Sequence, residues 1–226
     1  MYTKPALPRV FLPYFPLAHL CFAVQSTRMN PNWAEENLQT IRTLMERSAL
    51  YRHALAPIML FAGIVGVLAA AAGLAFHLDS PDRFFELWLV TAVVVVIGAL
   101  LITRRQALKD GEVFWSPPTR RVAQALAPAL AAGFISAFLV RWPGDETPFV
   151  WALFYGCALH SAGFFMARGV KWFGWIYIVL APCAFVAFVT LHPHLSPHWV
   201  MGFFFGVLHL AYGAYLFFTE KRKNAA

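Results

Sequence analysis

Residues 84–102 read FFELWLVTAVVVVIGALLI, and this stretch decides the class of fold. It holds one charged residue, Glu86, close to its start. A helix needs about 20 mostly apolar residues to cross the hydrocarbon core of a bilayer. Backbone groups in lipid find no water to bond, so a spanning segment must satisfy them within itself. The stretch is therefore predicted to be a transmembrane helix.

Five more stretches of the chain have the same character. The predicted spans are Leu55–His77, Phe84–Ile102, Val122–Val140, Phe149–Met166, Trp172–Leu191 and Trp199–Phe218. Of the 226 residues, 60% are hydrophobic and only 13% are charged, whereas a soluble domain carries about 25% charged residues. The mean hydropathy is +0.60. We expect an all-α membrane protein in which residues 54–219 form a bundle of six transmembrane helices.

Lysine and arginine are distributed unevenly over the connections between these spans. All of them except Arg83 and Arg141 fall in the segment before the first span, in residues 103–121 and 168–171, and in the tail, 220–226. Positively charged connections stay on the cytoplasmic side of a membrane. We therefore predict a protein of the bacterial inner membrane with both termini in the cytoplasm and a basic cytoplasmic tail.

Two segments precede the first predicted span. Residues 1–30 are rich in proline and contain no cleavage site of small residues. We expect them to be disordered or extended, or to lie upstream of a natural start at Met29, and not to form a signal peptide. Residues 31–53 repeat apolar side chains at helical spacing opposite charged ones, which predicts a cytoplasmic amphipathic helix. Such a helix either lies on lipid headgroups or docks a cytoplasmic protein partner.

Glycine recurs at helical spacing in several of the predicted spans. Small residues let the backbones of neighbouring helices approach closely in lipid. The predicted helix-packing positions are Gly66, Gly73, Gly156, Gly163, Gly202, Gly206 and Gly213.

Two histidines lie within these glycine stripes, near the expected midplane of the bilayer. His160 is in the fourth predicted span and His209 in the sixth. A polar side chain at that depth is costly and calls for a role. Three roles are open: a structural hydrogen bond between helices, paired ligation of a b-type haem or a divalent metal, and proton relay or the lining of a substrate cavity. The structural role is the commonest for a buried histidine.

A second group of histidines falls in the connections on the other side of the membrane. Residues 191–199, LHPHLSPHW, contain His192, His194 and His198, and His77 ends the first predicted span. Beside the carboxylates of the neighbouring connections, these four histidines are candidate ligands for a divalent metal. The alternative is a solvated turn with helix-capping histidines.

Recognisable catalytic motifs are missing from the sequence. It contains no phosphate-binding glycine loop, no HExxH and no nucleophile elbow. The cysteines, Cys21, Cys157 and Cys183, form no CxxC pair. We expect neither catalytic activity of these classes nor a nucleic-acid partner.

Three segments carry a resemblance to known sequences: ENLQTIRTLMERSALYRHALAP at 36–57, WALFYGCAL at 151–159 and GVLHLAYGAYLFF at 206–218. As a set they resemble an uncharacterised family of small bacterial membrane proteins that share an NLxxIRxLMERS lead-in. The resemblance runs from about Asn32 to the C-terminus. It implies six spans after an amphipathic helix, with His209 in a Leu-His-x-x-Tyr-Gly pattern, and it implies no particular reaction.

Three functions follow from these features. The first is a non-enzymatic sensor, regulator or accessory subunit that acts through residues 31–53 and the cytoplasmic connections. The second is a redox or metal-binding membrane protein that uses His160 and His209, or the other histidines. The third is a small transporter that works as a dimer. The expected partners are the lipid bilayer, a cytoplasmic protein and a second copy of the chain.

Overall fold

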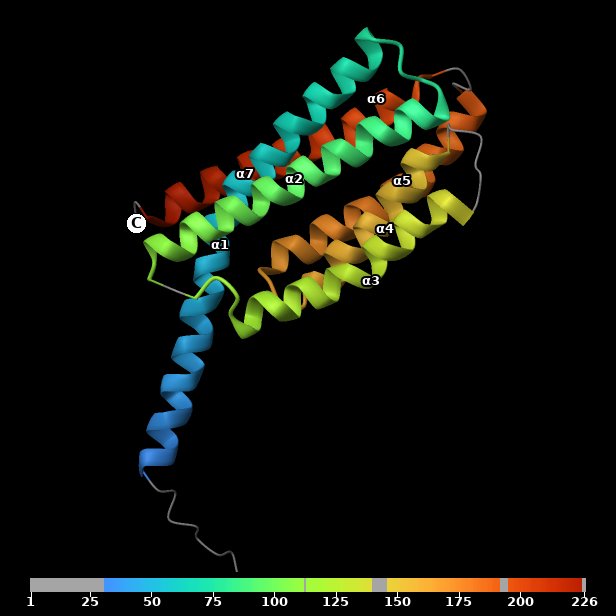
Figure 1. Ribbon diagram of the computed structural model, residues 1–226. Helices are drawn as coiled ribbons and strands as arrows, with labels where there is room; N and C mark the ends of the chain where they lie inside the picture. Colours follow the sequence, from blue (N-terminus) through green and yellow to red (C-terminus); the bar gives the residue numbers. More distant parts are fainter. Residues whose placement is uncertain (1–30, 112, 140–145, 192–194, 225–226) are drawn as a thin grey trace, which may run out of the picture. The chain divides into compact units, whose positions relative to one another are not determined.

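The structure, a computed structural model, describes residues 31–111, 113–139, 146–191 and 195–224, and every element within these ranges is helical. The helices are α1 (Pro31–Ala75), α2 (Pro81–Lys109), α3 (Pro117–Leu139), α4 (Thr147–Ala162), α5 (Arg168–Leu191), α6 (Pro197–Met201), the π-helix η2 (Gly202–Val207) and α7 (Leu208–Asn224) (Figure 1). The predicted all-helical fold is confirmed.

The chain divides into two compact units, residues 1–43 and 44–226. In the first unit the described residues form the start of α1, which continues without a break to Ala75 in the second unit. The predicted amphipathic segment and the first predicted span are therefore one helix, with Pro57 inside it. The predicted basic tail begins inside α7. Residues 1–30, predicted to be disordered or extended, lie outside the described residues.

Four of the described helical segments are long and apolar enough to cross a membrane. They are Ala54–Ala75, Pro81–Lys109, Gly169–Leu191 and Pro197–Thr219. The expectation of a membrane protein with transmembrane helices is thereby confirmed. By contrast, α4 has 16 residues, which at 1.5 Å per residue is about 24 Å and shorter than a typical hydrocarbon core.

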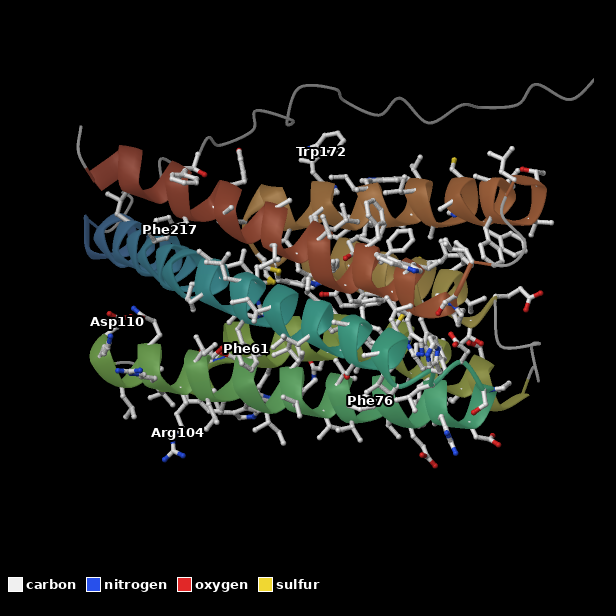
Figure 2. The ribbon with its side chains drawn as sticks, turned by 90° about the horizontal axis from the view of Figure 1, so that it is seen from above. Phe61, Phe76, Arg104, Asp110, Trp172 and Phe217 are labelled. Carbon is white, nitrogen blue, oxygen red and sulfur yellow. The ribbon has the colours of Figure 1, made fainter. Side chains whose placement is uncertain are left out.

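Large apolar side chains cover the outside of the second unit. Val90, Val96 and Leu101 on α2 are all more than half exposed. Trp172 on α5 also points away from the neighbouring helices (Figure 2), and Phe217 on α7 is exposed. Soluble proteins rarely expose so much contiguous apolar surface. These side chains therefore mark the surface that faces lipid.

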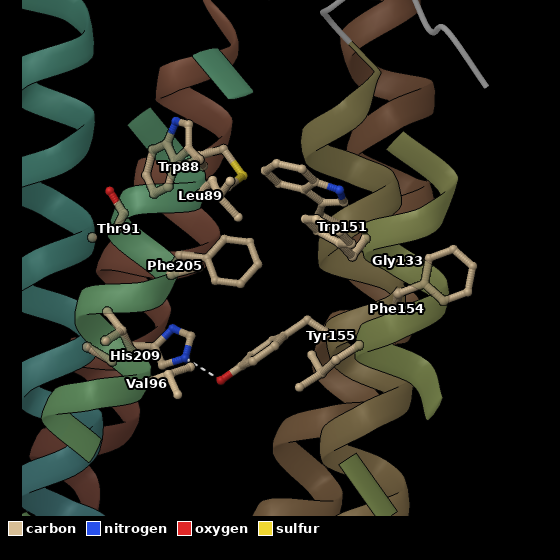
Figure 3. A pocket seen from close by; sticks show the side chains of 17 residues that line it. Trp88, Leu89, Thr91, Val96, Gly133, Trp151, Phe154, Tyr155, Phe205 and His209 are labelled. Atoms are coloured by element: carbon tan, nitrogen blue, oxygen red, sulfur yellow. Dashed lines mark hydrogen bonds between the residues drawn. The ribbon is translucent and has the colours of Figure 1, made fainter. Parts of the chain in front are cut away.

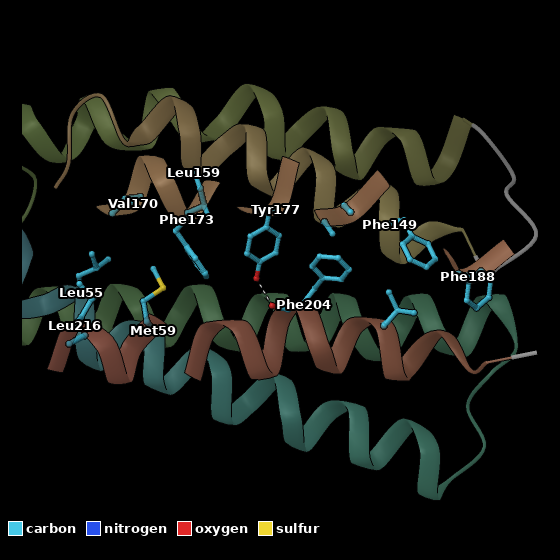
Figure 4. Close-up of a cluster of buried hydrophobic side chains, with 14 residues drawn as sticks. Leu55, Met59, Phe149, Leu159, Val170, Phe173, Tyr177, Phe188, Phe204 and Leu216 are labelled. Atoms are coloured by element: carbon cyan, nitrogen blue, oxygen red, sulfur yellow. Dashed lines mark hydrogen bonds between the residues drawn. The ribbon is translucent and has the colours of Figure 1, made fainter. Parts of the chain in front are cut away.

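A buried core joins the helices of the second unit. It is made of side chains from α1, α4, α5, α6, η2 and α7, namely Leu55, Ala56, Met59, Phe149, Ala152, Leu159, Val170, Phe173, Tyr177, Ala181, Phe188, Val200, Phe204 and Leu216 (Figure 4). Beside this core, α4 packs against α3 as well as against α5. Tyr177 lies at its centre and is fully buried.

The fourth and sixth predicted spans differ from the observed helices, the fourth in its end and the sixth in its continuity. The fourth was expected to reach Met166, but α4 ends at Ala162. At the next position, Gly163, an added Cβ would lie 2.6 Å from Cα of Lys171. This contact lets the chain turn back into α5 within a few residues. The sixth predicted span is interrupted by η2, which hydropathy does not reveal.

Candidate functional site

A cavity of about 320 Å³, here called the lateral cavity, opens between α2 on one side and α3 and α4 on the other (Figure 3). It is lined by Ala62, Gly66, Trp88, Leu89, Thr91, Ala92, Val95, Val96, Leu130, Gly133, Phe134, Trp151, Phe154, Tyr155, Met201, Phe205 and His209. Its volume lies at the lower end of the roughly 300–1,000 Å³ of small-molecule sites. Its walls are apolar apart from a few side chains.

The mouth of the lateral cavity lies between α2 and α3. Val96, Leu130 and Phe134 line the cavity and are also exposed on the outside of the bundle. The ring centroids of Phe85 and Phe134 lie 6.2 Å apart, so these two side chains connect α2 and α3 near the mouth. Because the rim is apolar and belongs to the exposed apolar surface, a molecule dissolved in lipid can enter without crossing water.

A buried hydrogen-bond network closes the floor of the lateral cavity. The Oη of Tyr155 lies 2.8 Å from Nε2 of His209 (Figure 3). Nδ1 of His209 lies 3.2 Å from the carbonyl oxygen of Phe204 and 3.1 Å from the Oη of Tyr177. The hydroxyl of Tyr177 also donates to the Phe204 carbonyl (Figure 4). His209 is 2% exposed, so the network lies between α4, α5 and the η2–α7 segment out of reach of solvent.

The π-turn of η2 makes the Phe204 carbonyl available to this network. The amide of Leu208 donates to the carbonyl of Phe203, five residues back, instead of to Phe204, its partner in an α-helix. The carbonyl of Phe204 instead accepts hydrogen bonds from the side chains of Tyr177 and His209. Single π-turns inside α-helices are rare and occur frequently at functional sites. The helix defect and the polar network are therefore one feature.

His198 forms a second buried network at the other end of the bundle. It is fully buried, and its Nδ1 accepts a hydrogen bond of 3.2 Å from Nε1 of Trp88. Its Nε2 donates to the carbonyl of Leu78 over 3.1 Å. An added Cβ at Gly73 would collide with its ring. His198 thus ties the start of α6 to α1, to α2 and to the turn between them.

The two histidines that the sequence paired lie in different surroundings. His209 belongs to the floor of the lateral cavity. His160 is not among the described residues that line the lateral cavity. Its ring forms T-shaped contacts with the rings of Phe164 and Trp175, at centroid distances of 5.4 and 5.2 Å. Its Nδ1 is buried without a hydrogen-bond partner in the described part of the chain. Both nitrogens of His209 are occupied by hydrogen bonds, so ligation of a metal or haem iron requires one of these bonds to break.

Of the other histidines proposed as metal ligands, His77 and His198 lie in the described part of the chain. His77 is exposed, has φ of 50° and lies two residues after the end of α1, and the N–H of Leu78 donates back to the carbonyl of Gly73. This is the position at which a helix adopts the left-handed conformation to terminate. His192 and His194 lie outside the described residues. Within the described ranges no three His, Cys, Asp or Glu side chains lie close enough to hold a metal ion.

The predicted packing glycines lie at contacts between helices. Gly66, Gly202, Gly206 and Gly213 lie where α1 meets η2 and α7, while Gly156 and Gly163 lie where α4 meets α5. An added Cβ at Gly206 would lie 2.8 Å from Cγ2 of Val67, and one at Gly156 would lie 2.6 Å from Cβ of Tyr177. The close approach at Gly156 brings Tyr177 into the core beside α4.

Sequence reasoning missed Tyr155, Tyr177 and Trp88, which hold the two buried histidines. One signal was present: Trp151 and Tyr155 are four residues apart in an otherwise apolar span and so share one helix face. Aromatic residues with a polar end usually find a hydrogen-bond partner when buried. The partner of each tyrosine lies on another helix, so the pairs could not be read from the sequence.

Compared with known proteins, the chain matches no family model, no curated protein and no solved structure.

Proposed function

We propose that this chain is a six-span membrane protein that takes up a small apolar molecule from the bilayer into the lateral cavity and acts as a non-enzymatic sensor or regulatory subunit. The observation that carries the proposal is the combination of an apolar mouth between α2 and α3 with a single hydrogen-bond network at the floor. A lipid-soluble molecule with one polar group matches that combination. Small-molecule sites commonly have this composition, mostly apolar with a few convergent polar groups.

The proposed topology places both termini in the cytoplasm, with α3 and α4 as the two additional spans. Arg104, Arg105 and Lys109 lie at the end of α2, and Arg120 and Arg121 at the start of α3. The acidic residues Asp79, Asp82 and Glu146 lie at the starts of α2 and α4 or next to them. The asymmetry between the two ends supports the orientation, because basic connections are retained in the cytoplasm.

Occupancy of the lateral cavity can be transmitted through α1. Ala62 and Gly66 line the cavity, and α1 is one continuous helix back to Pro31. The segment from residue 31 to residue 53 is also the predicted docking surface for a cytoplasmic partner. A molecule that changes the packing of α1 against η2 therefore acts on the helix that carries this surface, which favours a sensor.

The chemistry of the lateral cavity supports binding rather than catalysis. Its described lining contains no carboxylate, amine or thiol. The one histidine there is held by hydrogen bonds at both nitrogens. If His209 instead serves a haem, the purified protein will show a Soret band that shifts on reduction and is lost in His209→Ala.

The test of the proposal is quenching of tryptophan fluorescence by bromodecane in phosphatidylcholine vesicles that contain the protein. Trp88 and Trp151 line the lateral cavity, so a bromoalkane bound there quenches them by contact. We expect a saturable component of quenching above the linear component from tryptophans that face lipid.

Two matched substitutions locate that component. Ala92→Phe fills the lateral cavity from α2, whereas Ala187→Phe adds the same side chain on the exposed face of α5. We expect the saturable component to disappear in Ala92→Phe and to remain in Ala187→Phe. Linear quenching in the unsubstituted protein would overturn the proposal.

A further inference from the structure

We propose that the molecule bound in the lateral cavity is an apolar alcohol, and that its hydroxyl donates a hydrogen bond to the Oη of Tyr155. This inference rests on the proposed function and adds the chemical class of the ligand. The ligand class follows from the directions of the hydrogen bonds in the floor network, because each polar hydrogen of that network already has an acceptor.

The contacts of His209 fix which of its ring nitrogens carries the hydrogen. The Phe204 carbonyl can only accept hydrogen bonds, so Nδ1 of His209, at 3.2 Å from it, must carry the hydrogen. The nitrogens of His209 meet two phenols and this carbonyl. A buried imidazolium needs an anionic partner, and these neutral groups supply none. The neutral ring then leaves Nε2 as an acceptor.

The direction of the hydrogen bond between Tyr155 and His209 is then fixed as well. Because Nε2 accepts, the hydroxyl of Tyr155 must donate to it over 2.8 Å. The hydrogen of Tyr155 is thereby used, while a lone pair on its oxygen stays free. Tyr155 lines the lateral cavity, so its free capacity is that of an acceptor (Figure 3).

The remaining polar groups of the lining offer no donor to a ligand. Thr91 donates its hydroxyl to the carbonyl of Leu87, and Trp88 donates its N–H to His198. The N–H of Trp151 has no hydrogen-bond partner in the described part of the chain, but its nitrogen is buried on the side of the indole that is turned away from the cavity, and the six-membered ring faces the cavity (Figure 3). A ketone, ester or quinone would find no free hydrogen there, whereas an alcohol finds an acceptor. A ligand carbonyl could bind only by taking the Tyr155 hydrogen and leaving Nε2 of His209 unpaired, which is costly in a buried site.

The size and the mouth of the lateral cavity restrict the alcohol further. A volume of about 320 Å³ suits a molecule with one chain and is too small to enclose a lipid with two. The apolar rim at Val96, Leu130 and Phe134 requires a molecule that partitions into the bilayer. A single-chain or isoprenoid alcohol meets both conditions.

The experiment measures how well farnesol, farnesyl methyl ether and farnesene each relieve the bromodecane quenching, compared at equal mole fraction in the vesicles. All three are apolar and similar in size, and only farnesol can donate a hydrogen bond. We expect farnesol to bind about fivefold more tightly than the other two, the effect of one additional buried hydrogen bond. Equal binding of all three overturns the assignment of an alcohol and leaves the proposed function standing. Displacement by none of them, together with linear bromodecane quenching, overturns both.

Two variants assign the preference to the floor network. Tyr155→Phe alone would free Nε2 of His209, which also lines the cavity, to accept from the alcohol, so it is combined with His209→Phe. In this double variant the preference for farnesol should fall to about onefold. Tyr215→Phe removes a hydroxyl at an exposed position on α7 and should keep the fivefold preference. A preference that survives in the double variant contradicts the proposed contact. If the double variant does not fold, the comparison of farnesol with its methyl ether in the unsubstituted protein still decides between the two outcomes.

Discussion

His160 on α4 and His209 on α7 occupy similar places in the sequence and very different places in the structure. Each lies among glycines at helical spacing inside an apolar segment. His209 is 2% exposed and hydrogen-bonded through both ring nitrogens to groups on other helices or on the π-turn before it. His160 is half-buried against Phe164 and Trp175, and its Nδ1 has no partner among the described residues.

The difference between the two histidines shows what a glycine stripe does and does not imply. Beside His160, Gly174 of α5 lies so close that an added Cβ would be 2.5 Å from the backbone nitrogen of His160. Here the close approach is between backbones, and the imidazole is left at the edge of the contact. Beside His209, the partner residues are tyrosines, which reach across from α4 and α5. Both histidines lie at closely packed helix contacts. Only His209 has tyrosines within hydrogen-bonding distance, so only His209 belongs to a hydrogen-bond network.

The largest expected effect is that of His209→Ala. The substitution removes hydrogen bonds to Tyr155 and to the Phe204 carbonyl, and it leaves a void at the floor of the lateral cavity. We expect a loss of about 3 kcal/mol in the free energy of unfolding. Unfolding in mixed micelles with increasing sodium dodecyl sulfate, followed by circular dichroism, measures it. His160→Ala is the matched change and should cost clearly less; equal losses would contradict the distinction between the two sites.

A smaller effect is expected for Tyr177→Phe, which removes one hydroxyl and keeps the ring in the core. The hydroxyl donates to the Phe204 carbonyl, so its loss should cost about 1 kcal/mol, as for other hydrogen bonds between transmembrane helices. The same unfolding measurement applies. Tyr212→Phe is the control, because the Tyr212 hydroxyl is buried without a partner in the described part of the chain. A larger loss in Tyr212→Phe than in Tyr177→Phe would refute the assigned bond.

The smallest effect is expected for His160→Phe. A phenyl ring can keep the edge contacts to Phe164 and Trp175, and it removes a buried nitrogen that has no described partner. Replacing such a group by an apolar one should leave the free energy of unfolding unchanged or raise it by up to about 0.5 kcal/mol. A loss of 1 kcal/mol or more would mean that His160 has a partner outside the described residues.

Prediction from the sequence succeeded where the structure depends on a local property, the number of consecutive apolar residues. The apolar stretches around Phe84–Ile102 and Trp199–Phe218 identified helices capable of spanning a membrane, and the described fold is helical. The helix ends were less predictable, since the end of α4 depends on the contact of Gly163 with Lys171 on the next helix. The metal hypothesis for His198 failed to anticipate its partners, Trp88 and the Leu78 carbonyl, which occupy both of its nitrogens.

The sequence by itself determined the helical class of this protein and its suitability for a membrane, because both depend on the number of consecutive apolar residues. The tertiary structure decided the rest of the site. Whether a buried histidine is a partner in a network or an unpaired ring depends on side chains from other helices. The π-turn at Phe204 depends in the same way on hydrogen bonds from Tyr177 and His209 to a displaced carbonyl. Such pairings join residues far apart in the chain, and no local pattern encodes their distances.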